Sequence, residues 1–251
     1  MRSFIDISYG KLKNPAQKLD VYLPECESFP VFIYFHGGGI EGGDKGHHPY
    51  MYEDLTSRGI CVVSANYRMY PEAKYPEYLE DAAEAVKWVF DNIGRYGNVQ
   101  KIIVSGTSAG GYISRMLCFD KRWLSAVGLS PTDVDAYIHD AGQPTTHFNL
   151  LKKEYGIDPK RIIIDEASPL YHVGEDDKYS PMLIIVSDND MFNRYDQTML
   201  LVSTLEQYGH GQSEVSLKVM HGTHCHYVSS KKAPGENVFA LMVTDYIKKL
   251  N

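Results

Sequence analysis

The sequence has 251 residues, of which 43% are hydrophobic, and its formal net charge is −7. The length suits a single α/β domain with a substantial core, and the acidic balance argues against a nucleic-acid surface, which needs clustered Lys and Arg. No stretch approaches the roughly 20 apolar residues of a membrane span, and the N-terminus lacks the apolar run of a secretory signal. Four widely spaced cysteines without a CxxC pair favour a reducing, cytoplasmic setting.

Short apolar runs alternate with longer amphipathic stretches along the chain. Residues 4–9 and 19–23 predict an N-terminal hairpin. Buried strands are then predicted at 31–35, 61–65, 102–105, 126–130, 182–186 and 215–220, and helices at 78–90, 108–119, 194–208 and 238–250. Strands rich in β-branched residues that alternate with helices predict an α/β fold, with a mostly parallel sheet and helices on both faces.

Residues 131–180 break this alternation, because they contain no clear strand. A helix is predicted within them at 147–155. A loop of this length is usually functional, and an insertion after the C-terminal end of a strand lies over the ligand crevice of an α/β sheet. We therefore expect one domain over 1–251, with a lid at about 131–180.

A Gly-x-Ser-x-Gly turn follows the strand at 102–105 and opens the helix at 108–119. Gly106, Ser108 and Gly110 occupy the three fixed positions. Such a turn lifts the serine hydroxyl clear of the sheet, and the helix N-terminus behind it favours developing negative charge. Ser108 is the predicted nucleophile.

A His-Gly-Gly-Gly run at 36–39 directly follows the strand at 31–35. Consecutive glycines let backbone amides approach a ligand closely, which suits the binding of an oxyanion. A flexible loop and a phosphate cradle are the alternatives. The cradle is disfavoured because the Gly-Lys-Ser/Thr ending is missing.

A serine nucleophile needs a base that is oriented by an acid, and in this kind of fold the chain order is Ser, acid, His. Asp188 and Asp190 follow the strand at 182–186, and we favour Asp190 because it can turn back toward the sheet edge. His221, His224 and His226 follow the strand at 215–220. We favour His224, which comes after a small Gly-Thr turn, with His226 as its rival.

The three histidines beside carboxylates could also bind zinc. A zinc site would leave the serine turn and the glycine run unexplained, so we expect neither a metal nor a cofactor.

Three segments together resemble the hormone-sensitive-lipase-like esterases of the α/β-hydrolase superfamily, a group that includes small bacterial feruloyl and acetyl esterases. They are 36–39, Asn66-Tyr-Arg-Met-Tyr-Pro-Glu, and 106–111. The resemblance extends over about 31–250 and implies the α/β-hydrolase fold. It departs from the family at Asn66, where Asp is usual, and at Thr107, where Asp or Glu is usual. Neither position performs bond chemistry.

The resemblance also implies an oxyanion hole made by the amides of Gly38, Gly39 and Ala109, and it supports Asp190 and His224 as acid and base. We therefore expect a serine esterase that cleaves small acyl, hydroxycinnamoyl or carbohydrate-linked esters through an acyl-enzyme. An arylformamidase or small peptidase of the same fold is one alternative, and a non-catalytic hydrolase-fold binding protein is another. Only 35 residues precede His36, so we expect an open site without a large N-terminal cap.

Overall fold

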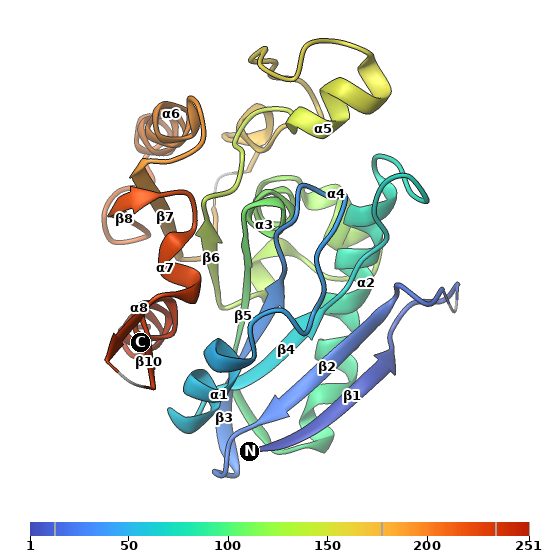
Figure 1. The fold of residues 1–251 in the computed structure, drawn as a ribbon, viewed down its shortest axis with the longest axis vertical. Helices are drawn as coiled ribbons and strands as arrows, with labels where there is room; N and C mark the ends of the chain where they lie inside the picture. Colours follow the sequence, from blue (N-terminus) through green and yellow to red (C-terminus); the bar gives the residue numbers. More distant parts are fainter. Residues whose placement is uncertain (13, 177, 234, 251) are drawn as a thin grey trace.

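The computed structural model describes residues 1–12, 14–176, 178–233 and 235–250. Eight strands form one twisted sheet in the order β1-β2-β4-β3-β5-β6-β7-β8 (Figure 1). The first two pairings, β1 with β2 and β2 with β4, are antiparallel, and all later neighbours are parallel. The strands are β1 (Arg2–Ser8), β2 (Lys18–Leu23), β3 (Ser28–Phe35), β4 (Cys61–Ala65), β5 (Asn98–Thr107), β6 (Ala136–Asp140), β7 (Met182–Asn189) and β8 (Val215–Thr223). A small hairpin pairs β9 (Lys231–Ala233) with β10 (Glu236–Asn237).

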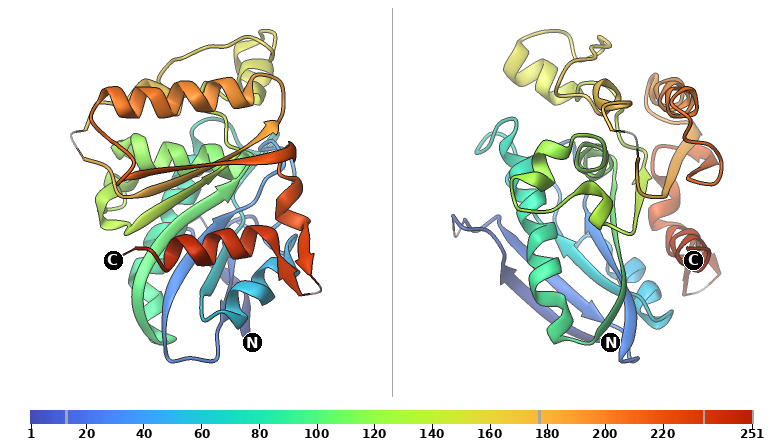
Figure 2. Two further views of the ribbon diagram at one scale, coloured as in Figure 1. Left: turned by 90° about the vertical axis from the view of Figure 1, so that its left-hand side faces the viewer. Right: turned by 180° about the vertical axis from the view of Figure 1, so that it is seen from behind.

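Helices cover both faces of the sheet, as the alternating pattern predicts. The helices are α1 (Pro49–Ser57), α2 (Glu77–Asn92), η1 (Ile93–Arg95), α3 (Ala109–Phe119), α4 (Lys121–Ser125), η2 (Pro131–Asp133), α5 (Phe148–Leu150), η3 (Leu151–Tyr155), η4 (Pro169–His172), α6 (Arg194–Gln207), α7 (His226–Ser229) and α8 (Val238–Ile247). Figure 2 shows α6 and α8 as two separate helices on the C-terminal half of the sheet. The α/β fold expected from the sequence is confirmed.

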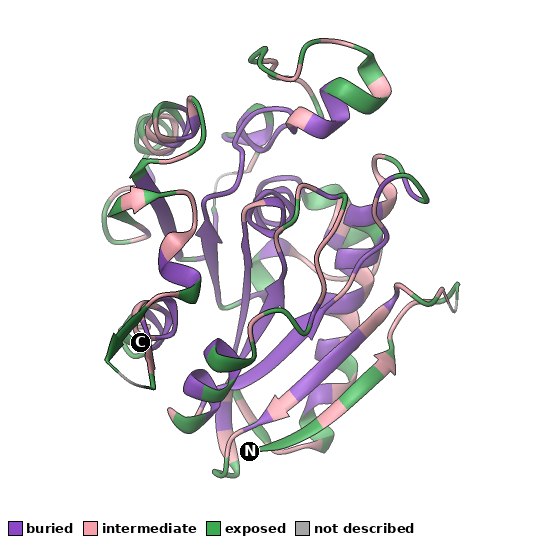
Figure 3. Ribbon diagram, in the orientation of Figure 1, coloured by how far each residue is buried: buried purple, intermediate pink, exposed green. Residues whose placement is uncertain are grey.

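Alternate side chains of each strand enter two separate cores. On β3, Ile33 and Phe35 belong to the core that includes residues of α2, α3 and α6, whereas Phe32 and Tyr34 belong to the core that includes residues of α1, α7 and α8. A strand that is buried on both faces must be apolar at consecutive positions, which explains the continuous apolar runs in the sequence. Figure 3 shows the central strands buried and the edge strand β1 largely exposed.

The strand predicted at 126–130 is wrong. These residues leave α4 through a turn in which Gly128 has φ +77°, a conformation that a strand does not use. The strand next to β5 is instead β6, five buried residues inside the segment that the sequence predicted to be strandless. Its buried His139 and Asp140 gave it a polar composition. The segment that leaves the sheet therefore begins after Asp140 and continues to β7.

This segment, residues 141–180, is called the insertion below, and it is fastened to the body at several points. Close to its start, the buried guanidinium groups of Arg115 and Arg194 donate to the carbonyls of Gly142 and Ala141. Further along, Tyr112 donates to the carbonyl of Ala167 at 2.7 Å.

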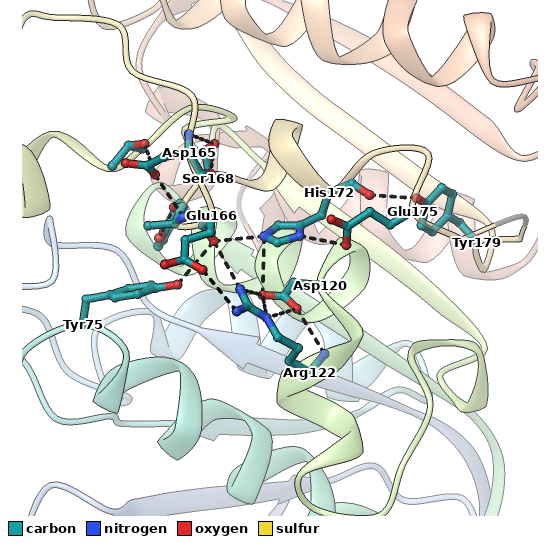
Figure 4. A network of polar contacts seen from close by, with 12 residues as sticks. Tyr75, Asp120, Arg122, Asp165, Glu166, Ser168, His172, Glu175 and Tyr179 are labelled. Carbon is teal, nitrogen blue, oxygen red and sulfur yellow. Dashed lines mark hydrogen bonds and ion pairs between the residues drawn. The ribbon is translucent and has the colours of Figure 1, made fainter.

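A polar network joins the end of the insertion to the end of α3 (Figure 4). The buried His172 contacts the carbonyl oxygen of Glu166 at 2.9 Å and the carboxylate of Asp120 at 3.5 Å. Arg122 binds the same Asp120 carboxylate at 2.8 Å, and Tyr75 donates to the Glu166 carbonyl at 3.3 Å. The late part of the insertion is therefore held by polar contacts around the buried His172 and Asp120.

A helix that spans a membrane must be both long and predominantly apolar. Across the described part of the chain, no helix is long and apolar enough to cross a membrane.

Candidate active site

The turn between β5 and α3 places Ser108 in a backbone conformation that few non-glycine residues adopt, with φ 57° and ψ −110°. The Ser108 amide donates to the carbonyl of Asp140 at 2.9 Å, which ties the turn to the end of β6. A Cβ on Gly110 would overlap the carbonyl oxygen of Phe35, and one on Gly106 would overlap Gly110. The two glycines are therefore required because the turn packs directly on its own helix and on β3.

Three side chains from different strand ends form a continuous hydrogen-bonded relay. The Ser108 hydroxyl lies 2.9 Å from Nε2 of His224, which follows β8. Nδ1 of the same ring lies 2.5 Å from Oδ1 of Asp190, which follows β7. Because an ionised carboxylate can only accept, Nδ1 carries the proton, and Nε2 is free to accept from the serine. The structure brings together the three residues that the sequence predicted.

The environment of Asp190 keeps it ionised although its side chain is fully buried. Burial tends to raise the pKa of Asp190, but hydrogen bonds from His224 and from the Met191 amide outweigh that effect and hold the pKa below its usual value of 3.8. The Met191 amide donates at 2.6 Å and the Ser187 amide at 3.3 Å. The carboxylate is thus fixed in position and charged, as the orientation of an imidazole requires.

The neighbouring candidates point elsewhere. Asp188 binds the exposed ring of His221 at 2.6 Å and the Gly222 amide at 2.9 Å. His226 faces the carbonyl of Thr223 at 2.8 Å. The three histidines therefore diverge, and no group of three or more His, Cys, Asp or Glu side chains in the described residues is arranged to hold a metal ion.

The glycine run at 36–39 lies beside the serine. An ideal Cβ on Gly37 would lie 3.3 Å from the Cβ of Ser108, and Gly38 and Gly39 have φ of +119° and +67°. Among the described residues, no acceptor is found for the amides of Gly38 and Gly39, and the amide of Ala109 begins α3, where helical partners are missing. The three amides predicted to bind an oxyanion are therefore available for that role.

His36 supports this loop without being charged. Its ring stacks on Tyr67 with centroids 4.6 Å apart, and its Nδ1 lies 2.7 Å from the Gly37 carbonyl. Burial lowers the pKa of His36 to about 4, so the ring is neutral at physiological pH.

The insertion also contacts the glycine loop, a connection that the sequence did not predict. The buried Asn149 donates to the carbonyl of Gly39 at 2.6 Å, and Lys153 forms an ion pair with Glu41. The amide of Asn149 thus fixes the backbone at a residue of the expected oxyanion hole.

Sequence reasoning also missed Asp140, because it lies in the unrecognised strand β6. Its buried carboxylate accepts from Thr107 at 2.8 Å and from the hydroxyl of Tyr227. Thr107 precedes Ser108, and Tyr227 lies in α7, directly after the His224 loop. Burial raises the pKa of Asp140 to about 6. The apolar residues of β6, followed by Ala141 and Gly142, were the signal that could have revealed this position.

A sequence profile of the BD-FAE family matches residues 19–205, which is well over half of the chain. The chain belongs to the BD-FAE family. The match includes the glycine loop, the serine turn and Asp190, whereas His224 lies beyond its end. The superfamily expected from the sequence motifs is confirmed.

Curated relatives of this BD-FAE protein include carboxylesterases from plants and bacteria. The Arabidopsis thaliana protein named probable carboxylesterase 7 is 34% identical over 127 residues, which cover 45% of this chain and 40% of that protein. Carboxylesterase NlhH of Mycobacterium tuberculosis is 38% identical over 101 residues, which cover 39% of this chain and 32% of that protein. The matched stretch thus spans less than half the length of either relative.

Solved structures share the fold over nearly the whole chain. A truncated carbohydrate esterase from gut microbiota superposes with a TM-score of 0.76 at 18% identity, covering 100% of this chain and 96% of that one. Esterase B from Lactobacillus rhamnosis gives 0.76 at 17% identity, covering 99% and 86%. At such identities the likeness establishes the fold alone.

Proposed function

We propose that this protein is a serine carboxylic-ester hydrolase that works through an acyl-enzyme. One observation carries the proposal: Ser108, His224 and Asp190 form a hydrogen-bonded relay at the ends of β5, β8 and β7. In this arrangement His224 takes the serine proton as the serine attacks the ester carbonyl, and Asp190 stabilises the resulting imidazolium.

The glycine loop supplies the second part of the proposed mechanism. Amides of Gly38, Gly39 and Ala109 would donate to the carbonyl oxygen as it becomes negative, and one such donor typically contributes about 100- to 1,000-fold in kcat. His224 then returns the proton to the leaving alcohol. In the second step His224 activates a water molecule, which releases the acid and regenerates Ser108.

The proposed substrates are small acyl esters, including hydroxycinnamoyl and carbohydrate-linked esters. The family abbreviation BD-FAE denotes bifunctional feruloyl and acetyl esterase. Similar solved structures include a carbohydrate esterase, a Thermogutta terrifontis esterase with propionate bound, and a Lactobacillus esterase inhibited by a tributyrin phosphonate. We propose that the insertion forms the cover over this site.

Replacement of the nucleophile tests the proposal. Ser108→Ala should abolish hydrolysis of p-nitrophenyl acetate and covalent labelling by a fluorophosphonate. Ser203→Ala, at an exposed position on α6, is the matched control and should keep both. Wild-type turnover by the Ser108 variant would refute the mechanism. Comparing kcat/KM for acetyl, butyryl, octanoyl and feruloyl esters would then measure the acyl preference.

A further inference from the structure

A cavity of about 200 Å³ lies between the insertion and the start of α6. Its walls include Phe148, Lys160 and Arg161 from the insertion and Met191, Phe192 and Arg194 from the loop after β7 and the start of α6. In Figure 1 both parts of the chain lie above the sheet, at the top of the molecule.

Two residues of the cavity wall contact the catalytic relay or the glycine loop. Met191 directly follows Asp190, and its amide donates to the Asp190 carboxylate at 2.6 Å. On the other side, Phe148 lies against the glycine loop, since an ideal Cβ on Gly39 would lie 3.5 Å from the tip of its ring. The cavity wall therefore borders both the acid of the relay and the glycine loop.

The apolar part of the wall is open to solvent at one aromatic residue. Phe192 is 87% exposed and Met191 is 41% exposed, although both are large apolar side chains. When a ligand covers large exposed apolar side chains at a cavity, the apolar surface removed from water favours binding. The position of Phe192 suits packing against a substrate.

The charged residues in the wall of the cavity are all cationic. Lys160, Arg161 and Arg194 line the cavity, and no Asp or Glu is among the described residues that do. Arg194 is buried and donates to the carbonyl of Ala141, so it is already engaged. Lys160 and Arg161 are exposed, and within the described part of the chain neither side chain forms an ion pair. In a chain with a net charge of −7, a wall with cations alone favours an anionic ligand.

We propose that this cavity is a substrate subsite for esters that carry a carboxylate, with the apolar part of the substrate against Phe148, Met191 and Phe192 and its carboxylate beside Lys160 and Arg161. The inference rests on the proposed esterase function and names a substrate class for it. The carboxylate can belong to the acyl group or to the leaving alcohol, and the chemistry of recognition is the same.

Paired probes separate these two sources. For the acyl side, mono(4-nitrophenyl) adipate is compared with the neutral 4-nitrophenyl heptanoate. For the alcohol side, 4-acetoxybenzoate is compared with the neutral 4-acetoxybenzamide. The measured quantity is the ratio of kcat/KM for the charged probe to kcat/KM for its neutral partner, which cancels general effects of a variant on catalysis.

In the double variant Lys160→Gln/Arg161→Gln, this ratio should fall on the order of tenfold in one of the two pairs, since each solvent-exposed ion pair contributes up to a few-fold. The wild-type ratio should also fall as salt is added, because salt screens exposed charges. The control Lys248→Gln/Lys249→Gln removes the same charge at the far end of α8 and should leave the ratio unchanged.

An unchanged ratio in both pairs, with neutral esters still hydrolysed by the wild type, would overturn this inference and leave the proposed function standing. Failure of the wild type to hydrolyse any of the four probes would overturn the proposed function and the subsite together.

Discussion

Replacing Asp140 with asparagine should change how the stability of the protein depends on pH. The Asp140 carboxyl is fully buried beneath the relay and accepts from Thr107 and Tyr227. Asn keeps the size of the side chain and one acceptor oxygen, but it cannot ionise. The variant therefore isolates the free-energy cost of charging this buried group.

The size of the effect follows from the two pKa values. Burial raises the pKa of Asp140 to about 6 in the folded protein, against 3.8 for an unperturbed aspartate. The difference of about 2 between the values corresponds to ~3 kcal/mol in the free energy of unfolding. Because the folded pKa is the higher one, this stability is fully present below pH 3.8. It is lost as the pH rises through 6, and no further change comes from this group above that.

Urea unfolding at pH 4, 5, 6, 7 and 8 measures this effect in wild type and Asp140→Asn. The stability of the variant minus that of wild type should rise by about 2 kcal/mol from pH 4 to pH 7, because part of the change already occurs below pH 4, and then stay level. Asp245→Asn, which removes an exposed carboxylate on α8, controls for the change in net charge. A difference that stays constant from pH 4 to pH 8 would show that burial does not raise the pKa of Asp140, and the reasoning would fail.

Three further substitutions test the site. Asp190→Asn should lower kcat for p-nitrophenyl acetate by about 10⁴-fold, as loss of the orienting acid does in other serine hydrolases. Asp188→Asn should keep kcat within a few-fold of wild type. The reverse order of these two effects would reassign the acid. Gly110→Ala should lower the free energy of unfolding by several kcal/mol, measured by urea unfolding, because the new Cβ overlaps the Phe35 carbonyl; a fully stable variant would contradict the packing of the turn. Asn149→Ala should lower kcat about tenfold with little change in KM, because the Gly39 backbone loses its anchor; a change in KM alone would assign Asn149 to substrate binding instead.

The parts of the fold that were predicted correctly have strong local signals. Apolar runs with flanking glycines mark β3 and β5, and close packing around Gly106 and Gly110 leaves few other residues possible there. The order of serine, acid and histidine then predicted the relay at the ends of three strands, which the structure has as β5, β7 and β8. Both Asp188 and Asp190 were compatible with that order, and only the tertiary contacts of each side chain separate them.

What the sequence did not predict depends on long-range contacts. Strand β6 has two polar residues among five, and its burial depends on α3 and β7 packing around it. Asp140 was therefore not visible as a site residue. The contact between Asn149 and Gly39 joins residues 110 positions apart, and no local pattern encodes such a contact.

The insertion is anchored on both sides of residues 156–164. This has a consequence for how the substrate preference of the protein can change. Asn149 and Lys153 hold the first half to the glycine loop, and the network of Asp120 and His172 holds the second half to α3 (Figure 4). Residues 156–164 lie between these anchors and carry Lys160 and Arg161, the two exposed cations of the proposed subsite. The entropic cost of closing a loop grows only slowly with its length, so replacing this turn by a sequence of another length or charge should destabilise the protein little. The turn is thus a natural unit for evolution, or for laboratory grafting, to alter which ester is accepted without moving the relay.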